Sequence, residues 1–197
     1  MSIKKIIKFR LMKKSILQIL VILSFVFSCK AQTYPLRTYI DIPENAYLKD
    51  TNNELNDYVG TWKGTWDNKT IYMTFKKITN KYDDVMKYYA DFLIGKFKVT
   101  TSNNQLILFD NTMVTDADAK IEGGKFRKKD DKYSFMYSDD DLCGMNGYII
   151  INFTDSTKTK LNWLFSDMTD IITSDCPYYD SPVFPQPLPK EIILIKQ

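Results

Sequence analysis

Residues 133–165 read YSFMYSDDDLCGMNGYIIINFTDSTKTKLNWLF, and they contain three runs in which every second residue is apolar. The apolar positions are Tyr133, Phe135 and Tyr137, then Ile149, Ile151 and Phe153, then Leu161, Trp163 and Phe165. Side chains of a β-strand point alternately to its two faces, so a period of two predicts antiparallel strands with one buried face. Asp and Ser between the last two runs favour a tight turn. The stretch therefore predicts three strands joined as hairpins.

The same alternation continues on both sides of this stretch. It predicts strands at residues 58–66, 69–78, 86–100, 105–110, 120–128, 132–138, 147–153, 158–165 and 191–196. Eight or nine hairpin-linked strands do not remain an open sheet, because both free edges would pair with other chains. We therefore predict an all-β fold, an antiparallel up-and-down meander closed into a barrel of eight or nine strands.

The entry to the first strand carries a short motif, DYVGTW at residues 57–62. It resembles the Gly-x-Trp entry of lipocalin-like (calycin) proteins. The resemblance implies a lipocalin-like barrel in which Trp62 plugs the closed end. That family also places an arginine after its late strands, over the tryptophan, whereas this chain has only Arg10, Arg37 and Arg127. The alternative is that Trp62 is an ordinary core aromatic.

The N-terminus has the layout of a signal peptide. Residues 16–27 are apolar except for Gln18 and Ser24, and Lys13 and Lys14 precede them. A run of about 12 residues is short for a membrane-spanning helix and typical of a signal-peptide core. We predict a cleaved signal peptide over residues 1–28, with Met12 as a possible true start.

The apolar run ends in Ser28-Cys29, which resembles the lipobox of bacterial lipoproteins. The resemblance implies acylation of the Cys29 thiol, cleavage before Cys29 and acylation of the new N-terminus. Together with the WKGTW opening at residues 62–66, the chain resembles small bacterial lipoproteins of unknown function. It would then be anchored by lipid in the bacterial cell envelope, with the outer membrane favoured, facing the periplasm or the surface. Secretion after cleavage at Ala31 and an uncut anchor are the alternatives.

Two further segments lack strand patterning. Residues 29–57 are expected to be the lipidated N-terminus and a spacer, since Pro35, Pro43 and the DTNN run at 50–53 break any period, and the barrel domain is expected to be 58–197. Residues 178–189 contain four of the seven prolines. They predict an extended strap leading to the closing strand at 191–196, with a proline motif for a partner as the alternative.

Cysteine counting supports the lipid anchor. Three cysteines are an awkward number in an oxidising compartment unless one is otherwise used. Acylation of Cys29 leaves Cys143 and Cys176, and we predict a disulfide between them. Two free thiols are the alternative.

Composition excludes several classes of protein. Histidine is absent, which removes Ser-His-Asp and Cys-His catalysis and almost all zinc enzymes. The first 28 residues hold six bases and no acid, so the remainder has 21 bases against 24 acids, a net charge of −3. A nucleic-acid partner is therefore not expected. Neither a metal nor another cofactor is expected, because the Asp139-Asp140-Asp141 run lacks calcium-loop spacing and favours a solvated turn.

Aromatic residues are the remaining functional signal, at 14% of the chain. They either line a ligand cavity or fill a small barrel. The candidates are Trp62, Tyr72, Tyr89, Tyr133, Phe135, Tyr137 and Trp163. We expect a non-enzymatic module that binds a small apolar or sugar ligand or an envelope protein. The alternatives are an inhibitor of a hydrolase acting through an exposed loop such as 139–146, and a carboxylate-dependent glycan hydrolase.

Overall fold

The computed structural model describes residues 32–103, 105–169 and 172–197. The chain divides into two units, Met1–Gln32 and Thr33–Gln197, and the described residues belong almost wholly to the second. The predicted signal peptide (1–28), the Met12 start and Cys29 lie outside the described residues. Within the described ranges, no helix has both the length and the apolar character needed to cross a membrane.

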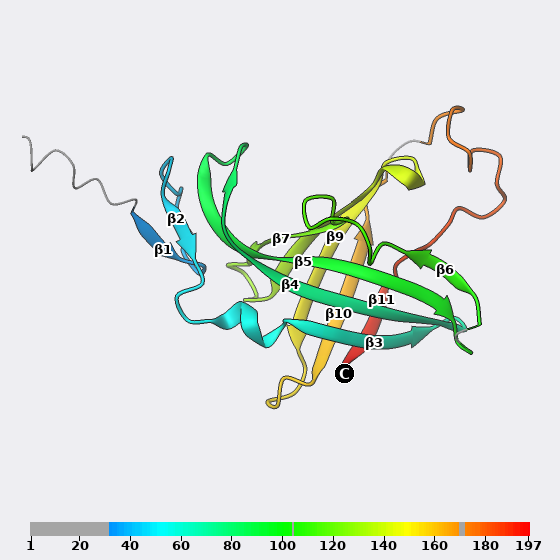
Figure 1. Cartoon of the computed structure of the whole chain (residues 1–197), viewed down its shortest axis with the longest axis horizontal. Helices are drawn as coiled ribbons and strands as arrows, with labels where there is room; N and C mark the ends of the chain where they lie inside the picture. The colour runs from blue at the N-terminus through cyan, green and yellow to red at the C-terminus, as the bar shows by residue number, and fades with distance from the viewer. Residues whose placement is uncertain (1–31, 104, 170–171) are drawn as a thin grey trace, which may run out of the picture. The chain divides into compact units, whose positions relative to one another are not determined.

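Eight antiparallel strands close into a barrel (Figure 1). In ring order they are β3 (Gly60–Trp66), β4 (Lys69–Asp83), β5 (Tyr88–Thr101), β7 (Ile121–Phe126), β8 (Tyr133–Asp139), β9 (Met145–Phe153), β10 (Lys160–Asp167) and β11 (Glu191–Lys196). The last strand, β11, pairs with the first, β3, and this pairing closes the ring. The predicted all-β meander and its closure are confirmed.

Three short strands lie outside the ring. β1 (Thr33–Pro35) pairs in parallel with β2 (Tyr47–Lys49), β2 pairs in parallel with β5, and β6 (Ile107–Asp110) pairs with β5 further along. Two 3₁₀ turns, η1 (Glu54–Asp57) and η2 (Asp140–Leu142), precede β3 and β9. Every predicted strand is present, whereas β1 and β2 were not predicted.

The apolar positions of the alternating runs form the barrel interior. Fully buried side chains there include Trp62, Phe75, Leu93, Phe97, Tyr133, Phe135, Tyr137, Ile149, Ile151, Leu161 and Trp163. Their rings pack closely, as shown by Phe75 stacked on Phe135 with centroids 5.1 Å apart. An eight-stranded barrel is only wide enough for its own side chains to fill, and this one is filled.

Because neighbouring strands are antiparallel, the turns fall alternately at two ends of the barrel. One end, which we call the mouth, carries the β3–β4 turn, the described residues between β5 and β7 with β6, the η2 turn and the described residues between β10 and β11. The other, which we call the closed end, carries η1, the β4–β5 hairpin tip, and the β7–β8 and β9–β10 turns. The strap, residues 172–190, therefore lies at the mouth, and its end reaches the core, where Leu188 is buried and the Trp163 indole N–H donates to the Pro189 carbonyl at 3.0 Å.

Trp62 fills the closed end. Its indole N–H donates to the Tyr58 carbonyl at 2.8 Å, and Tyr58 stacks on Phe153 with ring centroids 4.4 Å apart. The Lys196 ammonium lies 5.2 Å from the Trp62 ring centroid and donates to the Asp57 carbonyl at 2.8 Å. A cation from the last strand therefore covers the tryptophan, within the range of a cation–π contact.

The described part of the segment expected to be a spacer is folded against the barrel. We call residues 33–57 the arm. It contains β1, β2 and η1, and its Leu36, Leu48 and Leu55 are buried in the same core as the barrel side chains. Burying each of these leucine side chains stabilises the fold by roughly 1.5–3 kcal/mol relative to leaving it in solvent, as an open spacer would. The packed unit accordingly begins at Thr33 rather than at residue 58.

One edge of β5 is completed by several partners in turn, because no single strand follows it. The Tyr89 amide donates to the Ala46 carbonyl of the arm, and the Leu93 amide donates to the buried Tyr133 hydroxyl at 3.1 Å. Gly123 makes room for that hydroxyl, since a Cβ at position 123 would lie 2.5 Å from it. Further along β5, the Phe97 amide donates to the Asn111 side chain, and from Lys98 onward β5 pairs with β6. Buried backbone donors require partners, so these side chains are part of the barrel wall.

Candidate functional site

The aromatic residues named as possible cavity linings separate into two groups. Trp62, Tyr133, Phe135, Tyr137 and Trp163 are fully buried in the packed interior. Tyr72 and Tyr89 lie outside it and are partly exposed. Lys63 lies 5.5 Å from the Tyr72 ring centroid, and Tyr89 packs on Tyr82 with centroids 4.9 Å apart. The structure therefore does not bring these seven residues together around one cavity.

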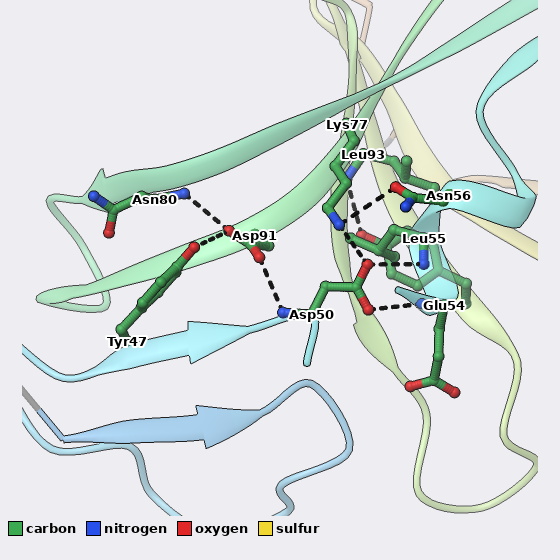
Figure 2. A network of polar contacts seen from close by, with 10 residues as sticks. Tyr47, Asp50, Glu54, Leu55, Asn56, Lys77, Asn80, Asp91 and Leu93 are labelled. Carbon is green, nitrogen blue, oxygen red and sulfur yellow. Dashed lines mark hydrogen bonds and ion pairs between the residues drawn. The ribbon is translucent and has the colours of Figure 1, made fainter. Parts of the chain in front are cut away.

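Two buried carboxylates fasten the arm to the barrel (Figure 2). Asp91 of β5 accepts hydrogen bonds from the Tyr47 hydroxyl at 2.5 Å, the Asp50 amide at 3.0 Å and the Asn80 amide at 2.9 Å. Burial and the neighbouring Asp91 raise the pKa of the Tyr47 hydroxyl, so this hydroxyl stays protonated and keeps donating. Asp91 thus joins β2 to the bulge that interrupts the β4–β5 ladder.

Asp50, the second carboxylate, caps the η1 turn. It accepts from the amides of Glu54 at 2.8 Å and Leu55 at 3.1 Å, and from the Lys77 ammonium at 2.6 Å (Figure 2). A buried charge is tolerated when it is paired and hydrogen-bonded in this way. The donors that Asp50 and Asp91 hold are the protein's own, so their arrangement is that of a structural clamp.

The polar pocket of interest lies at the mouth. We call it the mouth pocket, with a volume of about 250 Å³. Its lining includes Phe97, Phe109, Asn111, Lys120, Asp139 and Tyr178. The strands β5 and β6, the residue before β7, the end of β8, the η2 turn and the strap all contribute, so residues far apart in sequence meet there. The buried Phe97 and Tyr137 rings, with centroids 6.3 Å apart, separate the pocket from the deeper core.

Asn111 is the unusual member of this pocket. Its side-chain oxygen accepts a hydrogen bond from the backbone N–H of Phe97 at 2.5 Å. Its backbone N–H donates to the Phe97 carbonyl at 3.0 Å. The first of these bonds fixes which end of the side-chain amide is oxygen, because the Phe97 N–H needs an acceptor. The residue is only 5% exposed, and its Nδ2 has no hydrogen-bond partner among the residues that the structure describes. A buried donor without an acceptor costs about 1–3 kcal/mol, so an acceptor that reached this group would be stabilising.

Charged groups surround Asn111. The Lys120 ammonium bonds the Asp139 carboxylate at 2.5 Å and the Asp141 carboxylate at 2.7 Å, and the Tyr137 hydroxyl donates to Asp139 at 2.8 Å. Burial alone would lower the pKa of Lys120, but the bonds to these two aspartates raise it above its ordinary value. The Lys120 hydrogen bond likewise lowers the pKa of Asp141.

Asp110 adds a further carboxylate at the rim. Partial burial acts to raise its pKa, but hydrogen bonds from Thr112 and the nearby Lys98 bring it below the ordinary value. The pocket therefore holds ionised carboxylates and a protonated lysine at neutral pH. Within the described ranges, no group of three or more Cys, Asp or Glu residues is placed to hold a metal ion.

The predicted disulfide is confirmed and lies beside this pocket. Cys143, directly after η2, is bonded to Cys176 of the strap, with Cα atoms 5.6 Å apart. The Tyr178 amide bonds the Cys176 sulfur, and the Tyr178 ring meets Phe184 edge-on at 5.7 Å. The disulfide therefore holds the strap residue that covers the pocket.

The same bridge affects the loop considered for an inhibitor, residues 139–146. Asp139, Leu142 and Met145 are buried, and Cys143 is bridged. The loop lies against the core instead of projecting from it.

A second concave region lies on the outer face of β7, β8 and β9. Two open hollows of about 560 and 880 Å³ share Lys125, Ser134 and Tyr148. The β4–β5 hairpin tip borders the smaller hollow, and residues 39–41 of the arm border the larger. We call this region the outer groove.

Sequence reasoning missed Asn111 and Lys120 entirely. Asn111 directly follows the predicted strand at 105–110 and Lys120 begins the predicted strand at 120–128, and the alternation that predicts these strands gives no signal of the contacts that residues at strand ends make. Asp139 was grouped with its neighbours as a solvated turn, but the structure buries it and leaves Asp140 and Asp141 exposed. Position 139 continues the alternation in which Tyr133, Phe135 and Tyr137 point inward. This alternation could have predicted that Asp139 is buried.

Comparison with known proteins identifies one family. Residues 12–197 match the profile described as "Family of unknown function (DUF6705)". No curated protein and no solved structure matches the chain.

Proposed function

Since the chain belongs to the DUF6705 family, whose function is unknown, we propose a function from the mouth pocket: a non-enzymatic module that binds a small sugar-like ligand there. The observation that carries the proposal is the buried Asn111 Nδ2, a donor with no acceptor in the described part of the chain. A ligand hydroxyl or carbonyl at this point would complete its hydrogen bonding.

The rest of the lining suits a polyhydroxylated ring. Asp110 and Asp141 offer acceptors, Lys120 offers a donor, and Phe109 and Tyr178 offer aromatic rings. A sugar presents hydroxyls at its edge and an apolar face, which matches that combination. Drug-sized ligands occupy roughly 300–1,000 Å³, so a pocket of about 250 Å³ fits one sugar ring. A purely apolar ligand would leave Asn111 unpaired and would also desolvate the charges.

Binding fits this pocket better than glycan hydrolysis does. A glycosidase needs one carboxylic acid that is still protonated at working pH, and such groups have raised pKa values. The pKa values of Asp110 and Asp141 are lowered by their hydrogen bonds and by the nearby lysines. Asp139 is held by Lys120 and Tyr137.

We extend the proposal to the barrel type and the anchor. Lys196 covers Trp62 from the last strand, which is the position that lipocalin-like proteins give to an arginine. This supports a lipocalin-like assignment in which lysine replaces arginine. The lipobox resemblance and the pairing of the other two cysteines support acylation of Cys29 and an envelope location. Palmitate labelling that is lost in Cys29→Ser tests the anchor.

The binding proposal is tested by titrating the protein with N-acetylglucosamine and with glucose while recording amide NMR shifts. Shifts are expected at Phe97, Asn111 and Asp139, around the mouth pocket. In Asn111→Asp the oxygen facing Phe97 is kept but the free donor is lost, so affinity should fall at least tenfold, about 1.4 kcal/mol. Asn162→Asp, on the outer face of β10, is the matched control and should bind normally.

Tyr178→Ala provides a second test that leaves Asn111 and the barrel wall intact. Removing the ring that covers the pocket should also weaken sugar binding. The proposal is overturned when neither sugar shifts the mouth-pocket amides, or when Asn111→Asp and Tyr178→Ala both bind as the unmodified protein does.

A further inference from the structure

The tip of the β4–β5 hairpin presents two apolar side chains to solvent at the closed end. Val85 is 87% exposed and Met86 is 58% exposed. The Asp83 carboxylate accepts from the amides of both residues at 2.8 Å, and the Lys87 amide donates to the Asp83 carbonyl at 2.8 Å. The turn is thus held in one conformation with its apolar groups outward, and a preorganised surface loses little freedom on binding.

Strand register places the entry of the chain beside this tip. Thr33 of β1 is opposite Tyr47 of β2, and Tyr47 is opposite Tyr89 near the start of β5. Both pairings are parallel, so β1 begins at the end of β5 where the hairpin turns. The Asn45 amide also donates to the Lys87 carbonyl at 2.8 Å. Thr33 therefore lies about 10 Å from β5 across two strand spacings, at the level of Tyr89, which follows Met86 of the tip by three residues.

Chain length then limits the distance to the anchor. Cys29 precedes Thr33 by four residues, which span at most about 14 Å when fully extended. Because the arm is packed on the barrel from Thr33 onward, no longer spacer separates the domain from an acylated Cys29. The acyl chains would hold the bilayer surface within about 14 Å of Thr33, which lies on the same side of the barrel as the hairpin tip.

We propose that the Val85–Met86 tip rests in the interfacial layer of the lipid bilayer that holds the anchor, which points the mouth pocket away from the membrane. This inference rests on the proposed acylation of Cys29. The formal charges next to the tip cancel, since Lys81 and Lys87 are matched in number by Asp83 and Asp84. The contact is therefore apolar, and it does not depend on anionic lipid.

The chain offers a matched control at the opposite end. Met113, in the connection between β6 and β7 at the mouth, is 93% exposed, as apolar and accessible as the tip. The β6–β7 connection lies at the mouth, whereas Thr33 of β1 lies beside the start of β5 at the closed end. The tip proposal requires that position 85 contact the lipid and that position 113 not contact it.

The test uses the full-length acylated protein in phosphatidylcholine vesicles. With Cys29 acylated and Cys143 bonded to Cys176, Val85→Cys or Met113→Cys supplies a single free thiol for a fluorescent label. We expect lipid-borne nitroxide to quench the label at position 85 at least twofold more strongly than at 113, with no dependence on added phosphatidylglycerol. Equal quenching at the two positions, in protein that floats with the vesicles, overturns the tip contact and leaves the anchor standing.

Failure of the anchor gives a different result. Cys29→Ser should carry no palmitate and should not float with vesicles. If the protein with Cys29 intact behaves in the same way, the anchor and the tip proposal fall together. Binding of N-acetylglucosamine in the mouth pocket is measured separately and is unaffected by either outcome. Strong quenching at 113 with little at 85 would show the opposite orientation and also overturn the proposal.

Discussion

The two ends of the barrel are completed by different means. At the closed end, Trp62 is covered by Lys196, and the arm is fastened by Asp50 and Asp91 with protein donors. At the mouth, a strap without regular structure is tied by the Cys143–Cys176 disulfide, and the Asn111 side chain keeps a free donor in the described part of the chain.

This contrast separates stability from binding. Buried polar groups that bond fully to each other hold a structure rigid but leave nothing for a ligand. A buried donor left without an acceptor is destabilising, and it is tolerated where a partner can arrive. Asn152, near the closed end, also has a buried side-chain oxygen without a hydrogen-bond partner among the described residues, so the difference between the ends is the pocket that Asn111 lines. We infer that the closed end carries more of the stability of the fold, and we propose that recognition belongs to the mouth.

The strongest test of that contrast compares two tryptophans on one face of β3. Trp62→Ala should lower the free energy of unfolding by about 3–5 kcal/mol, because it empties a fully buried site at the closed end. Trp66, four residues along at the mouth, is only partly buried and lies under Lys69. Trp66→Ala should therefore cost about half as much or less. Urea unfolding at pH 7 measures both.

An equal loss in the two variants would break the comparison, because the mouth would then carry as much packing as the closed end. Thr65→Ala, exposed between the two tryptophans, is a control for substitution in β3 and should change the free energy of unfolding by less than about 0.5 kcal/mol.

The disulfide provides the next largest effect, at the mouth. Cys143 and Cys176 are 33 residues apart, so replacing both by serine should cost roughly 3–4 kcal/mol on the chain-entropy account. It should also free Tyr178 and weaken sugar binding in the mouth pocket. Urea unfolding and sugar titration of Cys143→Ser/Cys176→Ser measure the two effects, with Ser174→Ala in the strap as control. Unchanged sugar affinity in the double variant would mean that the strap does not shape the pocket.

Much of the barrel was predictable because its strands obey a local rule. The run 147–153 corresponds to β9 at Met145–Phe153, and 158–165 corresponds to β10 at Lys160–Asp167. In each strand, apolar residues at every second position form the buried face, and that pattern does not depend on distant contacts. The disulfide was predictable by counting, since assigning Cys29 to the proposed acylation leaves Cys143 and Cys176 as the remaining pair.

The parts that were not predictable depend on contacts between distant segments. β1 and β2 have three residues each and are strands because β5 offers an edge to them. β4 was expected to end at 78 but continues to Asp83, because Asp91 holds the bulge near Asn80. Asn111 belongs to the site only through its pairing with Phe97, 14 residues away. None of these features has a period or a spacing in the sequence.

The smallest predicted effect is electrostatic. It compares how the free energy of unfolding depends on pH when a carboxylate is removed at each end of the barrel. The pKa of Asp110, at the mouth, is lowered by Thr112 and Lys98, so the stabilisation from this carboxylate is present at neutral pH and is lost as pH falls below about 4. Because Asp110 and Lys98 are partly exposed, Asp110→Asn should cost less than about 1 kcal/mol at pH 7 and a smaller amount at pH 3. Asp41→Asn, exposed in the arm at the closed end, removes one negative charge without those bonds and should change neither value. Urea unfolding at the two pH values measures this. If Asp110→Asn and Asp41→Asn behave alike, the difference between the ends lies in the orphan amide and the strap, and not in the charges around them.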